Sequence, residues 1–338
     1  KHYWKSPKTS NKVWKKMAKE LELSNTEKKF IVDLLAQNQR LDGRKSLLET
    51  RNLNIQINPD TYGDVYVSLI TPEGKVGTRV HCKITADIVK PKEKRPFEGS
   101  FYVNCEINGL TGLQFENYSK PNSISAEGYY TRFLESMILR SNALDLEQLC
   151  IIAGEKVWDI RLDLHVLEYD GGFLECASIA CLTSLLHFKR PYVEVQNEKI
   201  HKVYTDLDDR DGVNLGVLHI PIAVKFNIFQ QLPTEELIKQ SNNTNSGKEL
   251  VVIDCTVKEE MLSNGELLVA LNKNREIVQF DKPGGVPLQT YRLLELANMA
   301  LPMVDEITNK ILKAIEVDEK KRNKYAHLLS AENDRYDN

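Results

Sequence analysis

The 338-residue sequence predicts an α+β protein that is built from two similar halves. Residues 53–88 and 158–166 alternate apolar and polar side chains, as half-buried strands do, and residues 173–188 then change to helical spacing. The same order of strands followed by a helix returns between residues 215 and 315. No repeat is visible at the level of single residues, so the similarity of the halves is inferred from element order alone.

The composition is that of a globular protein and limits the kinds of partner. The residues are 41% hydrophobic and 28% charged, which suits a chain that buries a core. No apolar run reaches the roughly 18 residues of a membrane span, and no secretory leader is visible, so we expect a soluble, intracellular protein without a membrane role. The net charge of -3 argues against nucleic acid binding over the whole surface. Any RNA contact must therefore be local.

Cysteines and histidines give no support for a metal centre. The six cysteines form no Cys-x-x-Cys pair, and most of them lie in apolar runs, as reduced core thiols do. The seven histidines are equally scattered and form no His-x-x-x-His pair. We therefore predict neither a bound metal nor a cofactor.

The first 16 residues differ from the rest, because they hold six lysines, two tryptophans and no acid. Basic residues interleaved with aromatic ones can bind single-stranded nucleic acid, but a flexible extension or a leftover of cloning is the interpretation that we favour for residues 1–16. Residues 17–40 are assigned to an N-terminal helix. Ser24 and Glu27 fit a capping box there, and the residues after them have one apolar face.

Residues 41–210 form the predicted first half. Four segments in it alternate as strands do, and the first three of them form a β meander: residues 53–57, 65–69, 80–88 and 158–166. The third strand runs into a loop, residues 90–96, that is rich in lysine, arginine and proline. Residues 126–140 have helical spacing.

After the last of these strands the chain turns at Asp170, Gly171 and Gly172 and enters a helix at Phe173 and Leu174. Apolar and small residues cover nearly the whole circumference of this helix, so we predict that it is buried at the centre of the fold. A glycine turn that leads into a helix is a favourable context for phosphate, because backbone amides point outward at a helix N-terminus. The two residues that should hold the phosphate are nevertheless apolar.

Residues 211–315 form the predicted second half. We expect four strands in it, near residues 215–229, 250–256, 266–271 and 276–280. Pro283, Gly284 and Gly285 then interrupt the pattern before a long helix from Leu288 to Ile315. Residues 231–248 are rich in Asn, Ser and Thr and are predicted to be a surface insertion. Residues 316–338 are predicted to be a charged C-terminal tail.

Several segments, in the right order and with the right separations, together resemble the ribonuclease PH family. They are Arg40 to Arg44, CIIAGEKVWDIRLDLHVLEYDGG at residues 150–172, HFKRP at residues 187–191 and NKNREI at residues 272–277. Within the family, the chain is most similar to ring subunits of the eukaryotic RNA exosome. The resemblance covers roughly residues 18–330 and implies the ribonuclease PH fold, whose two halves are of the ribosomal protein S5 domain 2-like type.

The resemblance also implies that the phosphate site is degenerate. Active members of the family place Gly-Gly-Thr-Arg at the start of the central helix, where the hydroxyl and the guanidinium help to hold phosphate. Phe173 and Leu174 stand at those two positions here. Because loss of one such donor typically reduces the rate by about a hundred- to a thousandfold, we predict no phosphorolysis at this site. Simple packing of the two side chains in the core is the alternative role, and it agrees with inactivity.

A carboxylate pair that the family uses for acid or metal chemistry corresponds to Asp254 and Glu260. Both positions remain acidic, although Glu260 replaces a shorter aspartate. Two acids in a loop after a strand are more often solvated or capping residues than catalytic ones. Without a phosphate clamp, we interpret the pair as a remnant.

Basic residues near one helix are the RNA-binding candidates. In ring members of the family, the helix that corresponds to residues 131–140 faces a central channel, and Arg132 and Arg140 are the matching residues here. Lys92, Lys94 and Arg95 in the preceding loop can add charge near that channel. A solvated surface loop is at least as good an interpretation of Lys92.

The resemblance implies a non-catalytic ring subunit of the RNA exosome that binds and threads RNA for 3′–5′ processing and degradation, in rRNA maturation, RNA surveillance and mRNA turnover. Its expected partners are another ribonuclease PH-type subunit, as a heterodimer within a six-membered ring, cap subunits with S1 and KH modules, and a separate 3′–5′ nuclease. The expected compartments are nucleus, nucleolus and cytoplasm. The alternatives are an active phosphate-dependent 3′–5′ exoribonuclease and a stand-alone RNA-binding module.

Overall fold

The structure is a computed structural model that describes residues 23–107, 126–196, 199–204, 211–230 and 249–322. Several predicted segments fall outside these ranges. They are the basic segment 1–16, the first residues of the segment 17–40, the polar insertion 231–248 and the end of the charged tail, residues 323–338.

The first half is a mixed sheet in which the strands follow the order β1-β2-β3-β6-β4, and β5 pairs with β6. The strands are β1 (Asn52–Ile57), β2 (Asp64–Ile70), β3 (Val76–Val89), β4 (Ser100–Ile107), β5 (Cys150–Ile152) and β6 (Lys156–Glu168). The registers Leu53↔Leu69 and Ile55↔Val67 place the apolar side chains of the meander on one face. The predicted meander and the predicted strand over residues 158–166 are confirmed.

The edge strand β4 is missing from the predicted strands, although its buried residues Phe101, Val103, Cys105 and Ile107 alternate with exposed ones. It pairs with β6 in parallel, and helix α3 (Ala126–Leu139) lies beside it. Two glutamates of α3 accept hydrogen bonds from backbone amides of β4: Glu127 from Ile107 at 3.1 Å and Glu135 from Val103 at 3.3 Å. These carboxylates thus accept hydrogen bonds from some of the backbone amides at this edge, which discourages pairing with another strand.

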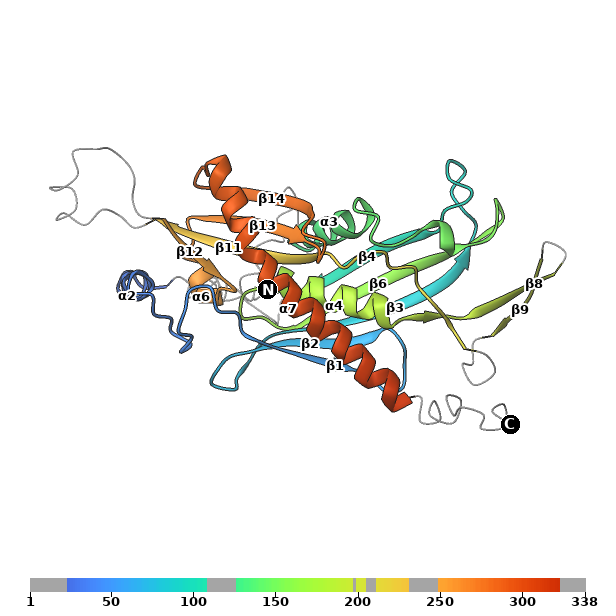
Figure 1. Cartoon of the computed structure of the whole chain (residues 1–338), viewed down its shortest axis with the longest axis horizontal. Coiled ribbons are helices and arrows are strands. Elements are labelled where there is room, and N and C mark those ends of the chain that lie inside the picture. Colours follow the sequence, from blue (N-terminus) through green and yellow to red (C-terminus); the bar gives the residue numbers. More distant parts are fainter. Residues whose placement is uncertain (1–22, 108–125, 197–198, 205–210, 231–248, 323–338) are drawn as a thin grey trace, which may run out of the picture.

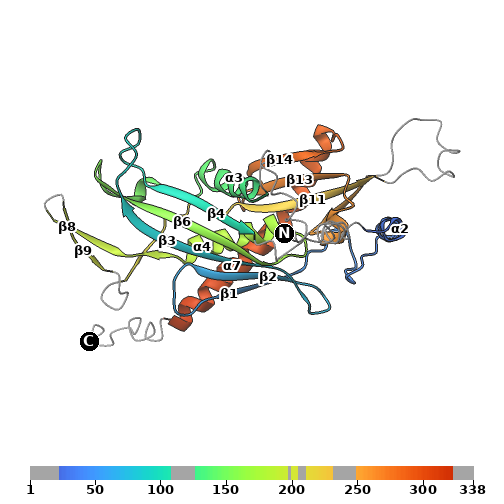
Figure 2. The same cartoon turned by 180° about the vertical axis from the view of Figure 1, so that it is seen from behind.

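Helix α4 (Phe173–His187) is the centre of the fold, as predicted. All of its residues from Phe173 to Leu185 are buried, and Ala177 and Ala180 are completely so. It contacts β2 and β3 of the first sheet and β11 of the second. Seen from behind, β1, β2, β3 and β6 lie in front of α4 and of the long helix α7 (Thr290–Arg322), so both helices cover the same face of the first sheet (Figure 2).

The second half is an antiparallel sheet in the order β12-β11-β13-β14. Its strands are β11 (Ile222–Gln230), β12 (Glu249–Ile253), β13 (Gly265–Leu271) and β14 (Ile277–Gly285). Helix α2 (Asn25–Ala36), which has the predicted capping box, packs its buried Ile31 and Leu35 against Phe229 and Leu250 of this sheet. The short helix α6 (Val257–Glu260) follows β12 (Figure 1).

Two boundaries of the second half differ from the prediction. The first strand begins at Ile222 rather than near residue 215, because Pro221 has no amide to donate to a ladder and the preceding residues pair with the first half. There, β10 (Val213–Asn214) pairs with β7 (Lys189–Arg190). At the other end, β14 continues through the Pro-Gly-Gly segment that was expected to interrupt the pattern, since Gly284 and Gly285 pair with β13 across a register shift.

A projecting hairpin is a further element that the sequence patterns do not predict. It consists of β8 (Tyr192–Gln196) and β9 (Lys199–Tyr204), which pair only with each other among the described strands. It extends from the end of α4, on the right in Figure 1.

Helix α7 crosses both halves and contacts α4, β1, β11 and β13 (Figure 1). It continues without a break to Arg322, so the segment from residue 316 that was predicted as a charged tail begins as part of this helix. Some of its charges are paired, which supports the helix: Asp318 is buried and lies 3.1 Å from Nε2 of His187 and 2.6 Å from Nε of Arg322.

Two possible features do not occur in the part of the chain that the structure describes. None of its helices combines the length and the apolar character that crossing a membrane requires. No group of three or more His, Cys, Asp and Glu side chains within it is arranged to hold a metal ion.

Candidate functional site

The glycine turn before α4 lies at the junction of the two halves. Gly171 and Gly172 have φ values of +75° and +67°, in the left-handed region that favours glycine. A Cβ at Gly171 would overlap the carbonyl oxygen of Cys255 and lie 2.8 Å from the carbonyl carbon of Thr256. Only glycine therefore lets the start of α4 approach the turn between β12 and α6 so closely.

The two residues after the turn point into the core. Phe173 and Leu174 are each 3% exposed and belong to the main apolar cluster. The ring of Phe173 packs edge-on against Tyr130 of α3, with 4.8 Å between ring centroids. Neither side chain offers a polar atom to an anion at the start of α4.

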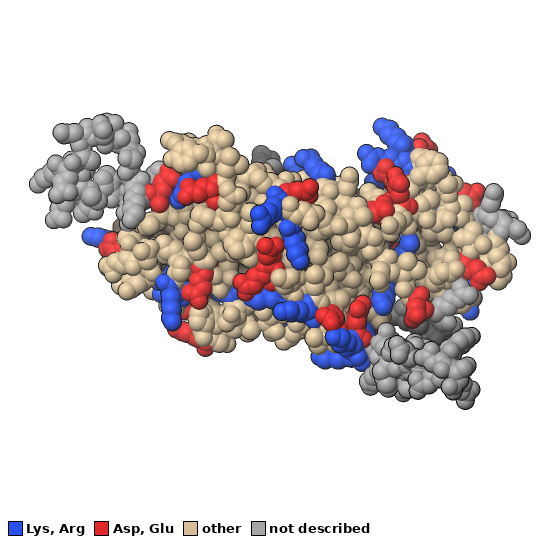
Figure 3. Space-filling model, viewed as in Figure 1, with Lys and Arg blue, Asp and Glu red and all other residues tan. Residues whose placement is uncertain are grey.

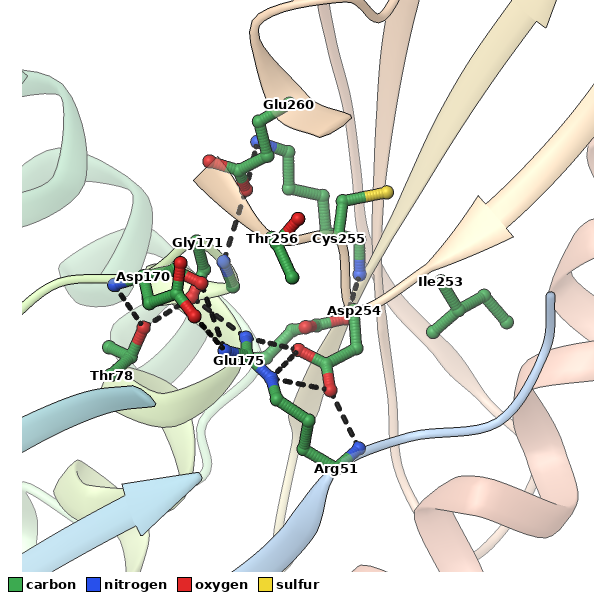
Figure 4. Close-up of polar contacts among 12 residues, drawn as sticks. Arg51, Thr78, Asp170, Gly171, Glu175, Ile253, Asp254, Cys255, Thr256 and Glu260 are labelled. Carbon is green, nitrogen blue, oxygen red and sulfur yellow. Dashed lines mark hydrogen bonds and ion pairs between the residues drawn. The ribbon is translucent and has the colours of Figure 1, made fainter. Parts of the chain in front are cut away.

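Arg51, which the sequence patterns do not single out, lies beneath the glycine turn (Figure 4). Its guanidinium donates hydrogen bonds to the carbonyl oxygens of Asp170 and Gly171, both at 2.9 Å. It also donates to Asp254, with 2.5 Å between Nη2 and Oδ1. The hydroxyl of Thr78 donates to the Gly171 carbonyl as well. The contacts with Asp170 and Gly171 involve the turn's carbonyls, so Arg51 stabilises the turn, and the carboxylate of Asp254 neutralises the charge of Arg51.

Asp254 is a buried structural anion rather than a solvated loop residue. It is 3% exposed, and its carboxylate accepts hydrogen bonds from the Arg51 amide at 2.7 Å and from Arg44 at 3.1 Å. Burial alone would raise the pKa of Asp254, but the charges of Arg51 and Arg44 more than offset it and hold the pKa below its ordinary value. The residue also has φ of +49°, an uncommon backbone conformation that these contacts hold in place.

The Arg40 to Arg44 segment supports the same turn. Arg44 donates to the carbonyl oxygen of Asp254 at 2.8 Å, and Arg40 donates to it at 3.0 Å. Arg40 is paired in turn with Glu259 of α6, with 2.5 Å between Nη2 and Oε2. Both arginine side chains are fully buried, so this segment joins α2 to the loop after β12.

Glu260 lies directly at the start of α4. Its Oε1 accepts the backbone amide of Gly172 at 3.1 Å, and its Oε2 accepts the hydroxyl of Tyr169 at 2.7 Å. Lys225 lies 3.1 Å from Oε1 and also pairs with Glu266 at 3.1 Å. A helix N-terminus attracts anions, and here the protein's own carboxylate uses its first amide. Glu260, like Asp254, is therefore part of a network and not a free acid.

Glu175 completes the cluster from within α4. Its Oε1 accepts the backbone amide of Lys225 at 2.8 Å, which links α4 to a stretch of β11 that pairs with β13 but lies beyond the part paired with β12. Burial raises the pKa of Glu175 to about 8, and the negative charge of Asp254 adds to this effect. The folded protein therefore holds Glu175 mainly in its protonated form at neutral pH.

We expect the substitution Glu175→Gln to stabilise the protein increasingly as pH rises from 5 to 8. The folded pKa of Glu175 lies above its ordinary value of 4.5, so the stability it contributes is present below that value and is lost as pH rises toward 8. Glutamine keeps the acceptor for the Lys225 amide and does not titrate. The difference in unfolding free energy should grow by roughly 3 kcal/mol over this range, measured by denaturant melts at several pH values.

The matched control for this experiment is Glu155→Gln, which changes an exposed glutamate in the turn before β6. Its melts should follow those of the wild type at every pH. A difference between the Glu175→Gln variant and the wild type that does not vary with pH would contradict the assignment of a buried, protonated Glu175.

The predicted RNA-binding residues are separate from this junction. Arg132 and Arg140 are both exposed, and their spacing of eight residues corresponds to about 12 Å along α3. Glu127 contacts the end of β4 and Glu135 its middle, so α3 runs antiparallel to β4. Arg140 therefore lies toward the loop between β3 and β4, and Arg132 lies further from it.

The loop between β3 and β4 holds Lys92, Lys94 and Arg95, which are all exposed. Charged side chains of both signs gather there, at the upper right of Figure 3. Arg95 is paired with Glu98 at 2.8 Å, and the ammonium of Lys92 lies 5.0 Å from the ring centroid of Tyr102. Lys94 has no ion pair among the described residues, so of the three side chains it is the one with the fewest contacts to acidic or aromatic neighbours.

Comparison with known proteins agrees with this architecture of two packed halves. Residues 49–191 match domain 1 of the 3′ exoribonuclease family, ribonuclease PH, and residues 219–301 match its domain 2. The chain therefore belongs to the ribonuclease PH family of 3′ exoribonucleases. The resemblance and the fold class predicted from the sequence are confirmed.

The relatives include proteins of almost the same length. The exosome complex component RRP45 of Saccharomyces cerevisiae is 44% identical over 94% of this chain and 99% of its own length. The human exosome complex component RRP45 is 37% identical over 90% of this chain, which spans 63% of that longer protein. A chain of the Archaeoglobus fulgidus exosome, solved with RNA bound to the active site, has the same fold, with a TM-score of 0.63 at 24% identity over 85% of this chain and 98% of that one.

Proposed function

We propose that this chain is a non-catalytic ring subunit of the RNA exosome. Its similarity to exosome complex components named RRP45 extends over nearly the whole chain, which supports a shared place in that complex. In this role the chain binds and threads RNA for 3′–5′ processing and degradation. The processes served are rRNA maturation, RNA surveillance and mRNA turnover.

The observation that carries the non-catalytic part of this proposal is the composition of the α4 N-terminus. Phosphorolysis brings inorganic phosphate to an RNA phosphodiester, so cations and hydroxyls must hold two anions together. Phe173 and Leu174 are packed in the core instead, and Glu260 adds a negative charge where an anion would have to bind. The nearby cation Lys225 is already paired with Glu260 and Glu266. Repulsion and missing donors both disfavour phosphate here.

An assay for phosphorolysis tests this proposal. The purified chain, incubated with single-stranded RNA and inorganic phosphate, should release no nucleoside diphosphate above the level of a variant with Phe173→Ala and Leu174→Ala. Because that variant removes core side chains, the same assay without phosphate gives a second comparison that needs no mutation. Phosphate-dependent release of nucleoside diphosphates by the wild-type chain would instead support the alternative, an active exoribonuclease.

We expect the double substitution Arg132→Glu and Arg140→Glu to weaken RNA binding and its dependence on salt. If each arginine contacts one phosphate, the slope of log affinity against log salt should fall by about 1.4 for single-stranded RNA. Fluorescence anisotropy with a labelled oligonucleotide at several salt concentrations measures this slope. Lys75→Glu, in an exposed turn and already paired with Glu73, is the control and should leave it unchanged. An unaltered slope in the arginine variant would show that α3 does not contact the RNA.

The partners in this proposal are those of an assembled exosome. The chain pairs with another ribonuclease PH-type subunit as a heterodimer within a six-membered ring, lies under cap subunits with S1 and KH modules, and passes RNA to a separate 3′–5′ nuclease. It acts in nucleus, nucleolus and cytoplasm. A stand-alone RNA-binding module is the alternative, and native mass measurement after co-expression with a ring partner separates a heterodimer from a monomer.

A further inference from the structure

A groove of about 460 Å³ lies between strand β1 and the last turns of α7. One wall consists of Ile55, Gln56 and Ile57. The other consists of residues from the end of α7: Lys313, Ala314, Val317, Asp318 and Lys321. None of these residues belongs to the junction around Asp254 or to the RNA-binding candidates, so the groove is a separate feature of the surface.

The β1 wall is the edge of a strand and not its face. Side chains of successive strand residues point to opposite faces of a sheet, so a wall lined by Ile55, Gln56 and Ile57 together must follow the strand's edge. β1 is the last strand of the first sheet and pairs only with β2 among the described strands. Its other edge therefore presents backbone amides and carbonyls that no described strand uses.

The α7 wall combines apolar side chains with unpaired cations. Val317 is 51% exposed, although it lies beside Ala314 and opposite the isoleucines of β1. Lys313 and Lys321 are exposed, and neither forms an ion pair with another described residue. Asp318 also lines the groove, but Arg322 pairs with its carboxylate at 2.6 Å and Nε2 of His187 lies 3.1 Å from it. Basic side chains, with acidic ones beside them, lie over these last turns of α7, near the lower edge of Figure 3.

We propose that this groove binds an extended, acidic peptide segment of a partner protein, which adds as a strand to the free edge of β1. The backbone of the segment pairs with β1, its apolar side chains contact Ile55 and Val317, and its carboxylates face Lys313 and Lys321. A nucleic acid suits the groove less well, because no aromatic residue lines it for base stacking. The proposal is independent of the function proposed above.

The test uses the full chain and two pools of synthetic nine-residue peptides. In the first pool Val or Ile alternates with Asp or Glu, and in the second the acids are replaced by Lys or Arg. Only the acidic pool should slow amide hydrogen exchange in β1. The double variant Lys313→Glu and Lys321→Glu should weaken its binding by about tenfold, because two exposed charge contacts are lost. Lys320→Glu is the matched control, since Lys320 is paired with Glu316 and does not line the groove.

Three outcomes would overturn the proposal. The first is unchanged exchange in β1 at millimolar concentrations of the acidic pool. The second is equal binding of both pools, or binding that the Lys320→Glu control reduces as much as the double variant. The third is that the double variant loses binding of a polyuridine oligonucleotide while neither peptide pool binds, which would make the surface a nucleic acid site.

Discussion

Asp254→Asn should destabilise the folded protein by about 3–5 kcal/mol, the usual cost of removing one partner from a buried ion pair. Arg44 and Arg51 both direct their fully buried guanidinium groups at this carboxylate. Asparagine has nearly the same shape but carries no charge, and its amide group places a donor among donors. Two buried cations would then lack an anion, and the Gly171 turn would lose the group that neutralises Arg51.

Thermal and denaturant melts measure this effect, with a fall in the melting temperature of roughly 10 °C. Asparagine tolerates the left-handed backbone of position 254 well, so the loss reports on charge and not on strain. Glu73→Gln, which breaks an exposed pair with Lys75, is the control and should change stability by less than about 0.5 kcal/mol. A further variant, Arg51→Met with Asp254→Asn, should cost less than the sum of its parts. Strict additivity would show that the two residues do not act as a pair.

The second large effect is a loss of stability: we expect Gly171→Ala to destabilise the folded protein by about 3 kcal/mol or more. Two costs combine here. An alanine at φ of +75° is strained by roughly 1–2 kcal/mol. In addition, its Cβ would meet only backbone atoms of Cys255, Thr256 and Val257, which cannot rotate away as a side chain would. The two halves would have to separate locally to make room.

A second glycine in the same protein separates these two costs. Gly154 has φ of +76°, and a Cβ built there meets no atom within 4 Å. Gly154→Ala should therefore show only the strain of about 1–2 kcal/mol. The difference between the two variants in denaturant melts measures the close approach of α4 to the turn after β12. Equal losses at both glycines would mean that this approach is looser than the structure indicates.

Local patterns predict the elements of this fold well, but they do not predict how distant residues meet. The central helix follows from its nearly continuous apolar surface, and the meander follows from strict alternation. β4 alternates just as clearly, so its signal was available. The start of β11 is less accessible to such reasoning, because residues 213–217 alternate in apolar character yet pair with the first half.

In the candidate site, contacts between distant residues are even harder to predict from local patterns. Phe173 and Leu174 follow from the glycine turn beside them, whereas Asp254 and Glu260 come from the resemblance to the family. Nothing local to Arg51 indicates that it lies under Gly171, 120 residues away in the chain. Such contacts arise only when two sheets pack around one helix, which is why the expectation of solvated loop acids fails for Asp254.

Helix α7 has a consequence for how the molecule is made. Its 33 residues are the last described element, yet they cover β1 of the first sheet as well as β11 and β13 of the second. While the ribosome still holds this segment, the apolar face of the N-terminal sheet lacks part of its cover. The cover of the first sheet is therefore completed only after α7 has left the ribosome, and until then the exposed sheet is a natural substrate for chaperones.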